Sequence, residues 1–120
     1  LFKITNLEDI NENFSRETGN QIVTAVSEEV SSNLAEEYIL VRYMGPKFAI
    51  VFSGIELNAI VSFMGQLKEK IEKIEIEGAN PKINIVLSTY YKGTALEGLT
   101  KKLEEYLDEA DKEENTINYL

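Results

Sequence analysis

The chain has 120 residues, 43% of them hydrophobic, so one compact domain can bury its own core but two typical domains cannot. Its 12 basic and 21 acidic residues give a net charge of −9, which repels nucleic-acid phosphates and anionic membrane surfaces. The absence of cysteine and histidine excludes disulfides, thiolate or imidazole metal sites and Ser-His catalysis. We expect a single domain over residues 1–120 that does not bind nucleic acid.

No segment has the length of a membrane span. The longest apolar run, residues 48–52, is far shorter than the roughly 20 residues that cross a bilayer, and no signal-peptide pattern precedes it. We therefore expect no membrane insertion by this stretch and a cytoplasmic location. Because the chain opens on Leu1 inside a β-prone run, we expect a fragment of a larger multidomain protein, one that can itself carry a membrane anchor.

The first third of the chain predicts a short strand and two helices. Residues 1–5 are apolar and β-prone, and a helix is expected to start near Asn6, a good N-cap residue. We expect Gly19 to end this helical pattern. A second helix should follow, with one apolar stripe formed by Val23, Val26, Val30 and Leu34.

The remaining elements begin with a hairpin. Residues 38–43 and 48–53 are apolar runs joined by four residues, a link short enough to require antiparallel pairing. An amphipathic helix (56–75), a buried strand (82–90), a last helix (95–113) and a closing strand (116–120) complete the chain. The order β-αα-β-β-α-β-α-β predicts an α+β fold, a mixed ferredoxin-like sheet with helices packed mainly on one face.

Two segments follow the pattern of one known family. Residues 3–20 lie without a gap over D-x-D-x-F-K-x-I-N-D-x-Y-G-H-x-x-G-D, and the hairpin brings Arg42, Gly45 and Phe48 to their signature positions. The matches in the first segment are Leu7, Ile10, Asn11, Glu12, Phe14 and Gly19. The chain thus resembles the GGDEF family, the bacterial diguanylate cyclase domain, over nearly its whole length. This resemblance implies a nucleotidyl cyclase-type sheet.

The resemblance also implies that the chemistry is lost. In the family, the first Asp of the N-terminal segment and the acidic pair of the hairpin hold the Mg²⁺ that neutralises the triphosphate of GTP. Here these positions carry Lys3, Pro46 and Lys47, and Met44 replaces the first signature glycine. We expect no metal, no cofactor, no catalytic residue and no cyclase activity. The family's Arg-x-x-Asp inhibitory site is replaced by Ala35 and Tyr38, which predicts no binding of cyclic-di-GMP there.

A few positions keep a role in binding by their place in the family motif. Asn11 matches the residue that reads guanine, and Asn20 replaces its acidic partner; the alternative is that they are helix-end and cap residues. Arg42 and Gly45 keep their signature places. Lys3 and Lys47 would hold a phosphate-bearing ligand without Mg²⁺ if they flank one cleft, the alternative being two solvated lysines.

These expectations lead to two functional hypotheses. The first is an inactive GGDEF-like domain that acts as a regulatory or dimerisation module in a bacterial cyclic-dinucleotide signalling protein, through self-association or a partner signalling domain. The alternative is a metal-independent nucleotide sensor, for GTP or a related ligand, that controls a fused output domain. A hydrolase has the least support, since no base, nucleophile or metal set can be assembled from these residues.

Overall fold

The order of elements is the one that the sequence predicts. The computed structural model describes residues 1–42, 45–88, 98, 101–102, 104–105 and 117–119. Its elements are β1 (Phe2–Ile4), α1 (Leu7–Asn13), α2 (Arg16–Asn33), β2 (Ile39–Arg42), β3 (Lys47–Val51), α3 (Leu57–Glu72), β4 (Ile83–Leu87) and β5 (Ile117–Tyr119). The described residues between 98 and 105 are helical.

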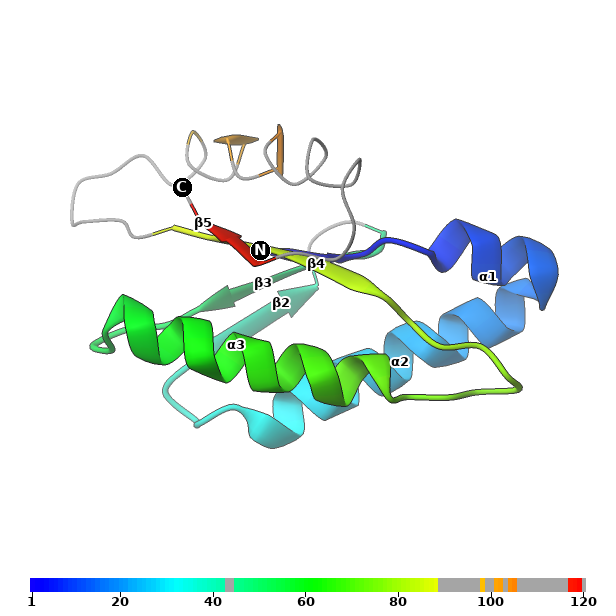
Figure 1. Cartoon of the computed structure of the whole chain (residues 1–120), viewed down its shortest axis with the longest axis horizontal. Helices are drawn as coiled ribbons and strands as arrows, with labels where there is room; N and C mark the ends of the chain where they lie inside the picture. Colours follow the sequence, from blue (N-terminus) through cyan, green and yellow to red (C-terminus); the bar gives the residue numbers. More distant parts are fainter. Residues whose placement is uncertain (43–44, 89–97, 99–100, 103, 106–116, 120) are drawn as a thin grey trace.

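The strands form one mixed sheet in the order β2-β3-β1-β4-β5. β1 pairs antiparallel with both β3 and β4, β2 pairs antiparallel with β3, and β4 pairs parallel with β5. In Figure 1, α2 and α3 cover one face of this sheet, and the described helical residues near position 100 lie over the other. The expected α+β architecture, with helices mainly on one face, is confirmed.

The core lies between the sheet and the pair α2 and α3. Because side chains alternate along a strand, Phe2 and Ile4 of β1 point to the same face as Phe48 of β3, and the rings of Phe2 and Phe48 stack with centroids 4.9 Å apart. All five residues of β4 are buried. The helices add to this core the fully buried side chains Ile22, Val26, Val30, Met64, Leu67 and Ile71.

The junction of α1 and α2 corrects one sequence expectation. Gly19 was expected to end a helix, but it lies inside α2, which begins at Arg16 after Ser15 accepts a hydrogen bond from the Thr18 backbone N–H at 3.0 Å. A Cβ added at position 19 would overlap Oδ1 of Asn11 in α1. The glycine therefore permits close approach of two helices and does not break one.

The long helix α2 is amphipathic. Its 18 residues include six buried ones along one side, and the rest are mostly polar.

Within the part of the chain that the structure describes, no helix is long and apolar enough to cross a membrane. Most of the last helix expected at 95–113 lies outside the described residues.

Candidate functional site

Lys3 and Lys47 are direct neighbours across β1 and β3. They are Cα partners in the antiparallel register, on the face opposite Phe2 and Phe48. The N–H of Ile4 donates to the carbonyl of Pro46 at 3.0 Å, so the Lys3–Lys47 pair that precedes it in the ladder is a non-hydrogen-bonded pair. In such pairs the Cα atoms approach to about 4.5 Å. The two ammonium side chains therefore leave the sheet side by side.

Two further described residues lie beside these lysines. Asn84 of β4 is the partner of Lys3 on the other side of β1, and it is buried, with 1% of its surface exposed. Glu104 approaches from the helical residues over this face, and its Oε1 lies 3.6 Å from Nζ of Lys47. We call Lys47, Lys3 and Asn84 the lysine row. It crosses three neighbouring strands of the sheet on the face that α2 and α3 do not cover.

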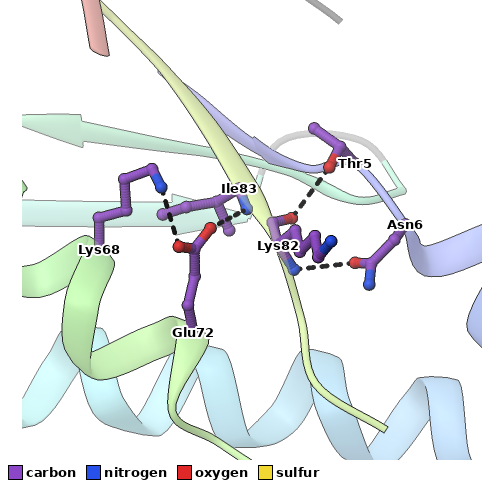
Figure 2. Close-up of polar contacts among 6 residues, drawn as sticks. All are labelled: Thr5, Asn6, Lys68, Glu72, Lys82 and Ile83. Carbon is purple, nitrogen blue, oxygen red and sulfur yellow. Dashed lines mark hydrogen bonds and ion pairs between the residues drawn. The ribbon is translucent and has the colours of Figure 1, made fainter. Parts of the chain in front are cut away.

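Backbone hydrogen bonds beside the lysine row fix its register. The N–H of Thr5 donates to the carbonyl of Lys82 at 2.8 Å, and the N–H of Lys82 donates to Oδ1 of Asn6 at 2.9 Å. Figure 2 shows the latter bond beside the one from the Thr5 hydroxyl to the Lys82 carbonyl, 3.3 Å long. Thr5 and Asn6 lie two and three residues after Lys3, and Lys82 lies two residues before Asn84, so these bonds support the register that places Lys3 opposite Asn84.

Glu72 of α3 binds the backbone at the start of β4. Its Oε2 accepts the N–H of Ile83 at 3.1 Å, while Oε1 pairs with Nζ of Lys68 at 2.8 Å. Figure 2 shows this carboxylate between the helix and the strand. A carboxylate that serves both partners satisfies a backbone donor at the entry of a fully buried strand.

Arg42 and Gly45 come together at the hairpin turn. The guanidinium donates from Nε and Nη2 to the Gly45 carbonyl at 3.4 and 3.3 Å. Gly45 has φ = 53°, a left-handed conformation that favours glycine. Pro46, which lacks an N–H, still accepts from β1 through its carbonyl. These residues shape the turn; Met44 lies outside the described residues.

Asn11 and Asn20 lie on α1 and α2, and both are exposed. The amide of Asn11 lies over Gly19. Asn20 is a helical residue within α2, so its alternative reading as a turn or cap residue is wrong. It lines a shallow hollow together with the carboxylates of Glu17 and Glu28. Because those carboxylates repel phosphates, this side of Asn20 is a poor place for a nucleotide.

The residues present do not fit the magnesium site of the fold. The lysine row brings two cations to positions where carboxylates would be needed, and cations repel Mg²⁺. Among the described residues, no group of three or more acidic side chains is placed to hold a metal ion. At the place of the inhibitory motif, Ala35 accepts a backbone hydrogen bond from Tyr38 at 3.1 Å, and the Tyr38 ring packs against Phe52. Neither position offers a charged group.

Sequence reasoning missed Asn84, Glu104 and Glu72. A single polar residue in the apolar run Ile83–Leu87 was a usable signal for Asn84, because buried polar groups need partners. Glu104 carried no such signal, since acidic residues are frequent throughout the surrounding segment. Its role depends on which strand lies under the helix, and this is a property of the fold.

Comparison with known proteins identifies the family of the chain. Residues 1–116 match the family model described as diguanylate cyclase, GGDEF domain. Over 80 residues the chain is 24% identical to the diguanylate cyclase DosC of Escherichia coli (strain K12), an alignment that covers 67% of this chain and 17% of DosC. The chain thus spans less than a fifth of that relative's length.

Solved structures show the same fold at low sequence identity. The GGDEF domain of DgcB from Caulobacter crescentus, in complex with c-di-GMP, has a TM-score of 0.83 at 12% identity, over 98% of this chain and 74% of that one. Diguanylate cyclase SiaD from Pseudomonas aeruginosa, in complex with its activator SiaC, has a TM-score of 0.84 at 10% identity, over 99% and 48%. With the family model matching almost every residue, this chain belongs to the GGDEF family.

Proposed function

We propose that the chain is a GGDEF domain that makes no cyclic-di-GMP and acts as a regulatory or dimerisation module within a larger bacterial signalling protein. One observation carries the loss of activity: the positions of the metal-binding carboxylates hold Lys3, Pro46 and Lys47, and the two lysines face each other across β1 and β3. Two ammonium groups at this spacing raise the electrostatic energy of a divalent cation between them. The complex of SiaD with its activator SiaC offers a precedent for a GGDEF protein with a protein partner.

An assay of GTP turnover tests the loss of activity. The chain is incubated with GTP and either Mg²⁺ or Mn²⁺, next to an active GGDEF domain as positive control, and cyclic-di-GMP is measured by mass spectrometry. We expect no product from this chain, because the described residues contain no group of three or more acidic side chains that could hold the metal. Metal-dependent formation of cyclic-di-GMP would contradict the proposal.

The exposed edge of the sheet supports a role in association. β2 is an edge strand, and its Ile39 and Val41 are 58% and 45% exposed on the same face. Exposed apolar side chains on an edge strand are a frequent contact surface. Light scattering over a range of protein concentrations tests self-association. A strict monomer at high concentration would leave only contacts with other proteins or a ligand-sensing role.

The second candidate function is metal-independent binding of a nucleotide. The pairing of Lys3 with Lys47 favours it, because two adjacent ammonium groups can bind phosphate oxygens without Mg²⁺. Titration with GTP, GDP and cyclic-di-GMP in EDTA, followed by NMR, tests the idea. We expect Lys47→Gln to weaken binding and Lys73→Gln, which removes an exposed charge at the end of α3, to leave it unchanged. Absence of shift changes at millimolar ligand would rule this function out.

A further inference from the structure

Glu104 lies where an anionic ligand of the lysine row would bind. Its carboxylate is 3.6 Å from Nζ of Lys47, and both side chains are largely covered, with 23% and 18% of their surfaces exposed. The described neighbours Lys101, Lys102 and Glu105 are all exposed. Glu104 is therefore the one of these helical residues that turns toward the sheet.

The two lysines repel each other, and a nearby negative charge reduces this repulsion. Directly opposed like charges on neighbouring strands are destabilising, and Lys3 and Lys47 are opposed in the register. The Glu104 carboxylate reduces this repulsion from within the chain. A phosphate group would reduce it in the same way and at the same nitrogen atom of Lys47.

We propose that Glu104 is an internal competitor for anions at the lysine row. A nucleotide phosphate binds Lys47 and Lys3 by displacing the Glu104 carboxylate, and the displacement loosens the described helical residues 101, 102, 104 and 105 from the sheet. This inference rests on the second candidate function, metal-independent nucleotide binding, and adds its regulation. The position of the helix then reports whether the site holds a ligand.

The geometry of the ion pair allows such displacement. Its 3.6 Å separation exceeds the 2.7–2.9 Å of a charge-assisted hydrogen bond. At this separation the pair lacks a charge-assisted hydrogen bond, so an incoming phosphate displaces the carboxylate at a small cost in free energy. Competition from Glu104 should weaken nucleotide binding by about fivefold.

Two variants on the same helix test the competition. The 120-residue chain, Glu104→Gln and Glu105→Gln are each titrated with GTP in EDTA and followed by NMR. Both substitutions remove one negative charge, but only the first removes a carboxylate that pairs with Lys47. We expect Glu104→Gln to bind GTP about fivefold more tightly than the unsubstituted chain, and Glu105→Gln to bind it with unchanged affinity.

Hydrogen exchange provides a second measurement that needs no variant. Saturating GTP should speed amide exchange at residues 101, 102, 104 and 105 of the unsubstituted chain. Equal GTP affinity of the two variants, or unchanged exchange in the saturated chain, overturns the competition and leaves nucleotide binding standing. Failure of every variant to bind GTP overturns nucleotide binding itself, and the competition with it.

Discussion

The two faces of the sheet are built in different ways. The face toward α2 and α3 is a continuous apolar layer in which Phe2, Phe48 and Ile85 come from three neighbouring strands and are almost fully buried. On the opposite face, the same three strands carry Lys3, Lys47 and Asn84. Because successive side chains point to opposite faces, one set can change without disturbing the other. The comparison shows how the core of a GGDEF fold can persist while the opposite face of its sheet carries two neighbouring lysines.

The largest expected effect is on the core face. Phe48→Ala removes a ring that stacks on Phe2 and has no exposed surface. We expect the free energy of unfolding to fall by about 3–5 kcal/mol, the cost of a large cavity in a packed core. Urea denaturation followed by circular dichroism measures it.

The matched control for the core is Val41→Ala on the edge strand. Val41 is 45% exposed on the opposite face, so its truncation should cost less than about 1 kcal/mol. Equal losses for the two variants would mean that the faces do not differ as described.

The next effect concerns the contact between α3 and β4. Glu72→Ala leaves the N–H of Ile83 without its carboxylate acceptor at the start of a buried strand. We expect a loss of about 1–3 kcal/mol in the free energy of unfolding, the cost of an unsatisfied buried donor. Glu69→Ala, an exposed change on the same helix, should cost less than about 0.5 kcal/mol. Similar costs would show that water replaces the Glu72 carboxylate.

A smaller effect on the free energy of unfolding is expected at Gly19, and its sign should depend on whether Asn11 is present. Gly19→Ala places a Cβ on Oδ1 of Asn11 and should destabilise the chain by about 1 kcal/mol. In the Asn11→Ala background the overlap is gone, and the higher helix propensity of alanine should stabilise the chain by about 0.5–1 kcal/mol. Thermal unfolding of the four proteins in this cycle gives both values. The same sign in both backgrounds would show that Asn11 moves aside at no cost.

Local patterns predicted most of the fold. Apolar runs and helical spacing located every element that the structure describes, and the hairpin followed from the four residues between its strands. The error at Gly19 arose because a glycine that breaks a helix and one that allows two helices to touch are identical in sequence. Only the position of Asn11 in space distinguishes them.

The site was predictable only in part, because its geometry depends on distant pairing. Lys3 and Lys47 were chosen as two positions of a motif, but their direct opposition follows from the insertion of β1 between β3 and β4. Strand order of this kind is set by contacts between segments far apart in the chain, so no local pattern encodes it. The same reason hid the Lys47–Glu104 pair.

The smallest expected effect on stability is on the edge strand β2, at a residue on the sheet face that carries the lysine row. Ile39→Thr keeps a β-branched side chain at a position that is 58% exposed, so the free energy of unfolding should change by less than about 0.5 kcal/mol in dilute solution. If this edge mediates self-association, unfolding of the unsubstituted chain should become harder as protein concentration rises, and Ile39→Thr should remove that dependence. Thermal unfolding at low and high concentration measures both. A concentration dependence that survives the substitution would place the contact between copies elsewhere than Ile39.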